Sequence, residues 1–125
     1  MVQATSIIAP SLDIGPTLFD FTGISKVTAG QSILPLLNDP TTPWRTSLYI
    51  EESDLFNSGI AIYAGTVTPN NLYVKYWTGE EELYDLIADP FQLSSLDKDP
   101  TQQALKISFE TSTIPQLGLA VLPAT

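Results

Sequence analysis

Four short runs of β-forming residues in the middle of the chain constrain its fold more than any other feature. They occupy residues 46–50, 60–67, 72–77 and 81–86. Turn-forming residues separate the last three runs, first Pro69 to Asn71 and then Thr78 and Gly79, and connections this short join antiparallel neighbours. The run at 72–77 also alternates between two faces, as a half-buried strand does. The pattern predicts an antiparallel meander of about four strands.

Helical patterns precede the meander. Residues 13–24 predict a short helix with Asp13 as its N-cap. Pro16 suits the first turn, and Gly23 can end the helix. The apolar face of this helix is formed by residues at helical spacing: Ile14, Leu18, Phe21. A second helix of one or two turns is expected within residues 30–37.

A further helix is expected after the meander, where Asp99 and Pro100 form a good helix start. Leu105 and Phe109 lie one turn apart in it and are expected to face the sheet. The order of elements predicts an α+β fold. In this fold a small antiparallel sheet of about four strands carries a C-terminal helix and follows one or two short N-terminal helices.

Turn-forming residues at 38–43 (NDPTTP) mark a predicted boundary between two domains. We expect a helical segment over residues 1–43 and an antiparallel-sheet subdomain over residues 44–125. The first segment contains little apolar material against which its own helix could pack. Part of the helix at 13–24 should therefore be exposed, because 125 residues cannot bury all three large apolar side chains in and next to it: Leu12, Phe19, Phe21.

Composition excludes several classes of function. The 125 residues include no His and no Cys, so the chain cannot build a Ser-His-Asp triad, a cysteine nucleophile or a histidine-bound zinc site. Five Lys and Arg against 14 Asp and Glu give a net charge of −9, which argues against binding to nucleic acid or to an anionic membrane surface. No apolar run approaches the roughly 20 residues of a membrane span, and the first residues do not resemble a signal peptide.

The densest acidic cluster comprises Glu80, Glu81, Glu82 and Asp85. Such a cluster could hold a cation or supply a pair of carboxylates for acid–base chemistry. It could equally be a solvated turn and the start of a strand. Because successive strand residues point to opposite faces, Glu81 and Glu82 are not expected to serve one site.

A second acidic motif, Asp97-Lys98-Asp99, has the D-x-D spacing of many calcium loops. It lacks the glycine and the distal glutamate of an EF-hand loop. The motif is better explained by Asp99 acting as a helix N-cap before Pro100.

Residues at both ends of the first predicted strand are candidate ligand contacts. Trp44 and Arg45 precede the strand, and a Trp-Arg pair can bind an anion or a sugar or can pack within the protein. Glu51, Glu52 and Asp54 follow it, in a loop that could line a substrate site or simply be solvated. The strand tyrosines could likewise form a ligand platform or a face covered by a helix. No P-loop, G-x-S-x-G or S-x-x-K motif occurs, and we assign no catalytic residue.

Four blocks of the chain resemble sulfatases of the arylsulfatase type, which belong to the alkaline-phosphatase-like superfamily. Residues 63–100 resemble the C-terminal run of these enzymes, most clearly in TGEEELYDL and the two DP pairs that follow. DIGPTLFDFTGI resembles their DxxPTLLDLAGI helix, GQSILPLL resembles G-x-SL-x-PLL, and Trp44-Arg45 matches the W-R that precedes the next strand in these enzymes. The chain departs from the pattern at five positions: Val67, Leu72, Gln92, Ser94, Ser95.

The resemblance implies the C-terminal portion of a sulfatase, a sulfuric ester hydrolase when whole. Family members use calcium and a formylglycine made from a C/S-x-P-x-R motif, which lies in their N-terminal part and is missing here. The implied partners are that N-terminal sulfatase domain and a sulfated small molecule or sugar. The expected role is structural, with a possible substrate rim: Glu51, Glu52, Asp54, Trp44, Arg45. Family members occur in the periplasm, in lysosomes or outside the cell, so the compartment stays open.

A second hypothesis comes from a different class of function. The chain could be an independent, non-catalytic binding or assembly module that uses the same sheet. An isolated chain that unfolds cooperatively as a monomer would favour the module, whereas aggregation would favour a severed segment with an exposed face.

Overall fold

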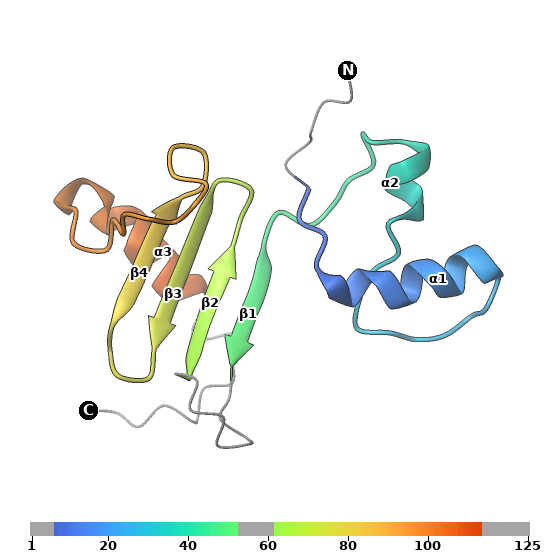
Figure 1. Ribbon diagram of the computed structural model, residues 1–125, viewed down its shortest axis with the longest axis horizontal. Helices are drawn as coiled ribbons and strands as arrows, with labels where there is room; N and C mark the ends of the chain where they lie inside the picture. Colours follow the sequence, from blue (N-terminus) through green and yellow to red (C-terminus); the bar gives the residue numbers. More distant parts are fainter. Residues whose placement is uncertain (1–6, 53–61, 114–125) are drawn as a thin grey trace. The chain divides into compact units, whose positions relative to one another are not determined.

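The computed structural model describes residues 7–52 and 62–113. The chain divides into two compact units, Met1–Arg45 and Thr46–Thr125, and each is described by itself. Figure 1 shows the order of the elements along the chain. The predicted division into domains 1–43 and 44–125 stays a prediction.

The first unit contains a 3-10 turn and two short α-helices. The turn, η1, spans Ser11–Asp13, and α1 follows directly over Ile14–Thr22. α1 ends as predicted at Gly23, whose φ of 72° lies in the left-handed region that favours glycine. α2 spans Leu34–Asn38 and has a proline in its first turn. Both predicted N-terminal helices are therefore present.

The start of α1 differs from the prediction. Asp13 occupies the position before the helix, but its side chain caps no helical N–H group. Its backbone is already helical, with φ −82° and ψ −13°, because the 3-10 turn leads straight into α1. A capping residue normally has extended backbone, so the local pattern misassigned this carboxylate.

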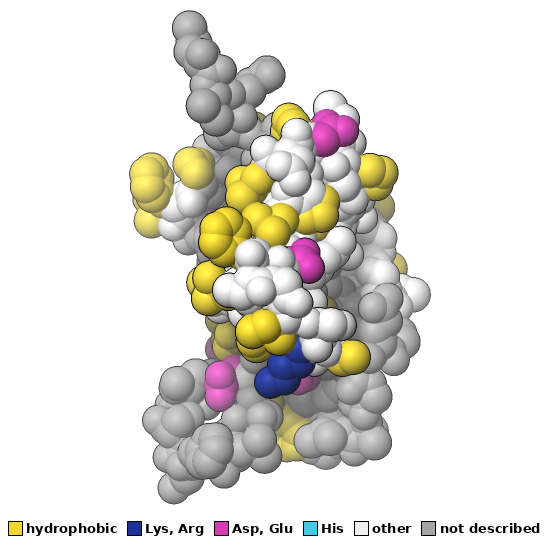
Figure 2. All heavy atoms as spheres, turned by 90° about the vertical axis from the view of Figure 1, so that its right-hand side faces the viewer, with side chains coloured by type: hydrophobic (Ala, Val, Ile, Leu, Met, Phe, Trp, Pro, Cys, Tyr) yellow, Lys and Arg dark blue, Asp and Glu magenta, His cyan; other side chains and the backbone are white. Residues whose placement is uncertain are grey.

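The apolar face of α1 points to solvent. No residue of α1 is buried, and Ile14, Leu18 and Phe21 are 60%, 59% and 76% exposed. Leu12, just before the helix, is also exposed. Figure 2 shows hydrophobic side chains gathered on the surface of this unit. The expectation that this helix stays partly uncovered is confirmed.

The second unit is built on the predicted meander. Its strands are β1 (Leu48–Glu52), β2 (Tyr63–Val67), β3 (Asn71–Tyr76) and β4 (Glu81–Asp85). They form one sheet in the order β1-β2-β3-β4, and every neighbouring pair is antiparallel. Gly79, with φ 90°, supplies the left-handed turn between β3 and β4. The α+β prediction is confirmed.

A C-terminal helix covers part of one face of this sheet. The 3-10 turn η2 (Pro100–Gln102) leads into α3 (Gln103–Thr113). Phe109 from α3 stacks on Tyr73 from β3, with ring centroids 6.0 Å apart. Together with Leu83 from β4 these residues form the core, and Leu96 and Leu105 pack against it. Fully burying one such side chain contributes roughly 1.5–3 kcal/mol, so this unit has a core of its own.

No helix in the described part of the chain is long and apolar enough to cross a membrane.

Candidate functional site

A buried ion pair organises the first unit. Asp13 is only 2% exposed, and its carboxylate accepts two hydrogen bonds from Arg45. Arg45 Nη1 lies 2.7 Å from Asp13 Oδ2, and Nη2 lies 2.9 Å from Oδ1. The backbone N–H of Gln31 donates a third bond to Oδ1 at 2.9 Å. This two-pronged contact is the geometry in which guanidinium and carboxylate bind most strongly.

Opposing effects act on the pKa of Asp13. Burial raises it, because a charged group loses its hydration. The hydrogen bonds from Arg45 and Gln31, together with the positive charge of Arg45, outweigh burial. They hold the pKa below its ordinary 3.8, so the carboxylate stays ionised.

Trp44 and Arg45 both make contacts within their own unit. The indole Nε1 of Trp44 donates to the carbonyl oxygen of Ile8 at 2.9 Å. The guanidinium of Arg45 lies 5.0 Å from the centre of the Trp44 ring, within range of a cation–π contact. The W-R pair therefore ties the end of this unit back to its beginning.

Glu51 and Glu52 were predicted to lie in a loop, but they are the last two residues of β1, because their backbones pair with Ala64 and Tyr63 of β2. Glu51 is exposed and accepts a hydrogen bond from the hydroxyl of Tyr49 at 3.2 Å. Burial and the negative charge of Glu51 raise the pKa of Tyr49, which keeps that hydroxyl a donor. Glu52 is half-buried opposite Tyr63. Adjacent strand residues face opposite ways, so Glu51 and Glu52 lie on different sides of the sheet. Asp54 lies outside the described residues.

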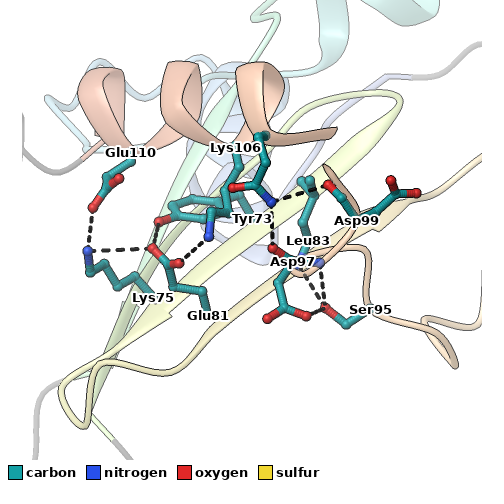
Figure 3. Close-up of polar contacts among 10 residues, drawn as sticks. Tyr73, Lys75, Glu81, Leu83, Ser95, Asp97, Asp99, Lys106 and Glu110 are labelled. Carbon is teal, nitrogen blue, oxygen red and sulfur yellow. Dashed lines mark hydrogen bonds and ion pairs between the residues drawn. The ribbon is translucent and has the colours of Figure 1, made fainter. Parts of the chain in front are cut away.

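The cluster at Glu80–Glu82 divides between the two faces, as expected. Figure 3 shows Glu81 between two lysines. One carboxylate oxygen lies 2.6 Å from Nζ of Lys106 on α3, and the other lies 3.5 Å from Nζ of Lys75 on β3. The buried hydroxyl of Tyr73 also donates to Glu81 at 2.8 Å. Lys75 pairs in addition with Glu110 on α3.

Glu81 is thus not a solvated strand residue. Burial raises the pKa of Glu81. The hydrogen bonds from Lys106 and Tyr73 and the positive charges of Lys106 and Lys75 outweigh burial, so the pKa lies below the ordinary 4.5. The pKa of Lys75 is raised, chiefly by its hydrogen bond to Glu110 and also by the negative charges of Glu110 and Glu81, which outweigh the effect of burial. Sequence reasoning missed this cluster because Lys106 and Glu110 come from a helix far along the chain. The available signal was the position of two lysines. Lys75 lies on the same strand face as Tyr73, and Lys106 lies next to Leu105 on the helix expected to cover that face.

The other acidic residues have separate environments. Glu82, on the opposite face, accepts hydrogen bonds at 3.2 Å from the hydroxyls of Tyr76 and Tyr84. Asp99 caps η2 as predicted, since its carboxylate accepts from the N–H of Thr101 at 2.8 Å. Within residues 7–52 and 62–113, no group of three or more acidic side chains is placed to hold a metal ion.

Comparisons with known proteins identify the family. The model of the C-terminal domain of N-sulphoglucosamine sulphohydrolases matches residues 2–115. The chain belongs to this family of sulfatase C-terminal domains. No match was found among curated proteins.

Solved structures agree with this assignment. The chain aligns with BT1596, described as a 2-O GAG sulfatase, at 29% identity and a TM-score of 0.63. It also aligns with BT4656, solved with its substrate D-glucosamine-2-N,6-O-disulfate, at 20% identity and a TM-score of 0.67. The phosphonate monoester hydrolase of Agrobacterium radiobacter aligns at 24% identity and a TM-score of 0.60. The last two likenesses show the shared fold.

The extent of these matches shows which part of a sulfatase this chain represents. Between 78% and 80% of the chain is covered, but only 22% or 23% of each larger protein. The chain is therefore a C-terminal sulfatase domain, and the resemblance seen in its four blocks is confirmed.

Proposed function

We propose that this chain completes a sulfatase, a hydrolase of sulfuric esters whose catalytic groups are supplied by an N-terminal portion. Two observations carry the proposal: a family model for a C-terminal domain matches residues 2–115, and the chain covers only about a fifth of each solved relative. In this proposal the formylglycine and the calcium belong to the N-terminal portion. Residues 1–43 form the end of the main domain, and residues 44–125 form the C-terminal subdomain.

The exposed face of α1 supports a docking role for the first unit. Isolated soluble proteins expose few contiguous apolar side chains, and larger patches mark interaction surfaces. The N-terminal portion of the sulfatase would cover this surface. The face is defined here by its large exposed side chains: Leu12, Ile14, Leu18, Phe21, Ile24.

The substrate rim belongs to the same proposal. We propose that the rim consists of five residues: Glu51, Glu52, Asp54, Trp44, Arg45. We also propose that the substrate is a sulfated small molecule or sugar. A sulfated sugar is the printed substrate of one structural relative, BT4656. Because the guanidinium of Arg45 is held by Asp13, this arginine would shape the rim and leave sulfate binding to other groups. Glu51, which is exposed, is the better placed to accept hydrogen bonds from a substrate hydroxyl.

The gene tests the proposal first. Translation of the DNA upstream of the codon for Met1 should give an open frame that contains C/S-x-P-x-R. A stop codon immediately upstream, with no sulfatase domain encoded nearby, would contradict the proposal and favour an independent module.

The purified chain gives a second test. Incubated with 4-nitrophenyl sulfate and calcium, it should release no nitrophenol above a buffer blank. Turnover would contradict the assignment of catalysis to the N-terminal portion. In the complete enzyme, Glu51→Gln should raise KM for a sulfated sugar and leave kcat unchanged, while Glu80→Gln, on an exposed turn residue, serves as the control.

A further inference from the structure

A shallow hollow lies beside α3, on the face of the sheet that the helix only partly covers. Its volume is about 260 Å³. The lining combines hydroxyl groups with two aromatic rings: Thr46, Ser47, Tyr49, Thr66, Thr68, Phe109, Ser112. All of these residues belong to the Thr46–Thr125 unit, and none is among the proposed rim residues.

The sheet register explains why the hollow exists. Tyr49 of β1, Thr66 of β2 and Tyr73 of β3 lie opposite one another and therefore share one face. α3 covers this face at β3, where Phe109 stacks on Tyr73. It is held towards β4 by the ion pair between Lys106 and Glu81. The helix also contacts β2, so the part of the face that it leaves open lies towards β1 and the residues that flank these two strands.

The lining is polar but uncharged. Its Ser and Thr hydroxyls can each donate and accept, as the hydroxyls of a sugar do. Some are already engaged, since Ser112 donates to the carbonyl of Phe109 at 3.2 Å and Thr68 donates to that of Asn71 at 3.2 Å. Thr46 and Ser47 are exposed, so their hydroxyls can exchange water for a ligand. The half-buried ring of Tyr49 offers apolar surface for the C–H face of a pyranose, while Phe109, which is buried, forms the floor of the hollow.

Charge decides which kind of sugar fits. Arg45 is bound to Asp13, and Lys75 and Lys106 are bound to Glu81 and Glu110. Among the described residues that line the hollow there is no lysine or arginine, and the chain carries a net charge of −9. A sulfate group here would meet no cation. The volume also lies just below the roughly 300 Å³ at which pockets for larger ligands begin, so it suits one ring.

We propose that this hollow binds a single uncharged sugar ring. If the chain completes a sulfatase, as proposed above, the ring would be an unsulfated unit of a longer saccharide. The sulfated unit of that saccharide would bind at the active site in the N-terminal portion. The hollow would then recognise the part of the substrate that carries no charge. The binding itself does not depend on catalysis and can be measured on the chain alone.

Nuclear magnetic resonance on the ¹⁵N-labelled full chain tests this proposal. N-acetyl-D-glucosamine, an uncharged hexosamine, should shift the amides of Ser47, Thr66, Thr68 and Ser112 and saturate in the millimolar range. D-glucosamine-2-N,6-O-disulfate should bind at least tenfold more weakly because of its charge. An absence of saturable shifts, shifts centred on other residues, or equal binding of the disulfate would each overturn the proposal.

Two matched variants on α3 locate the site. Ser112→Phe places a ring in the hollow and should weaken binding of N-acetyl-D-glucosamine at least tenfold. Ser108→Phe is the control, because Ser108 is also exposed, also bonds a carbonyl of its own helix and does not line the hollow. Equal effects of the two variants would refute the assignment. In the complete enzyme neither variant should change hydrolysis of 4-nitrophenyl sulfate, so loss of sugar binding and loss of sulfatase activity are separable.

Discussion

The two compact units of this chain are organised in opposite ways. In the first unit the deepest side chain is a carboxylate, Asp13, while Phe21 and its neighbours on α1 face outward. In the second unit the deepest side chains are Tyr73 and Leu83, both fully buried. The ions there lie at the edge of the core, where Glu81 binds two lysines. The most buried described side chain is thus an ion in the first unit, whereas in the second unit the most buried side chains belong to the aromatic and aliphatic core.

The contrast teaches what each unit needs from outside. An apolar core stabilises a fold because it removes surface from water, and the second unit has such a core. A buried ion pair mainly fixes geometry, since desolvation of the charges offsets much of their attraction. The first unit is therefore specified by its own residues but is expected to gain much of its stability from whatever covers α1.

The largest effect is expected from Leu83→Ala. Removing a fully buried leucine should lower the free energy of unfolding of the second unit by about 2–5 kcal/mol. Urea titration followed by circular dichroism measures the change. Leu93→Ala, at a residue that is 81% exposed, is the control and should change little. If the two units are stabilised separately, hydrogen exchange at the Gln31 amide in the first unit should be unaffected. Faster exchange there would show that the two units are not stabilised independently.

Asp13→Asn should affect the other unit. The substitution removes the charge that Arg45 and the Gln31 amide bind, and it leaves a partly buried guanidinium without its ion. A local loss of about 1.5–3 kcal/mol is expected, which is the usual contribution of hydrogen bonds to a charged group, because the guanidinium keeps part of its hydration. Hydrogen exchange should show loss of protection at Gln31 and none at Leu83. Asp20→Asn, at an exposed residue on α1, should leave both amides unchanged.

Glu81→Gln should give a smaller effect within the second unit. The amide can still accept from Tyr73 but no longer pairs with Lys106, and Lys75 keeps its contact with Glu110. Because the cluster is partly exposed, we expect a loss of about 1–2 kcal/mol. Urea titration measures it, with Glu80→Gln as the control. A loss as large as that of Leu83→Ala would mean that ions and not apolar packing dominate this unit.

The smallest effect is a dependence of stability on acid pH. The pKa values of Asp13 and Glu81 are lowered in the folded chain, so both groups bind protons more readily when unfolded. Their stabilisation is present above the ordinary values of 3.8 and 4.5 and is lost as the pH falls through the lowered folded values. Unfolding free energies measured between pH 6 and pH 3 should therefore decrease, and Glu81→Gln should flatten the decrease. A flat profile for the unmodified chain would contradict this.

Local sequence patterns were sufficient for most of the fold. The turn at Gly79 depends on neighbours in the sequence and is present as predicted. The half-buried alternation predicted for β3 is not, because the adjacent residues Tyr73 and Val74 are both buried. The cap at Asp99 is equally local, because it acts on the next turn of chain. Patterns that span a few residues report such features well.

The polar centres depend on residues far apart in the sequence. Asp13 has the local signature of an N-cap, but Arg45, 32 positions later, determines its role. Glu81 looks like a solvated strand residue until α3 brings Lys106 against it, 25 positions later. No window of a few residues contains either pair, so only the fold reveals them. The hollow beside α3 was not predicted for the same reason, because its lining comes from β1, β2, α3 and residues that flank the two strands.

The packing of Phe109 on Tyr73 has a consequence for biosynthesis. The hairpins of the meander pair residues close in sequence and can form as soon as they leave the ribosome. Phe109, however, is made 26 residues after Leu83, which at ordinary rates of translation is a delay of about one to five seconds. During that interval the nascent sheet presents Tyr73 and Leu83 without their cover. The second unit should therefore be most open to chaperones, or to pairing with another nascent chain, just before its last helix emerges.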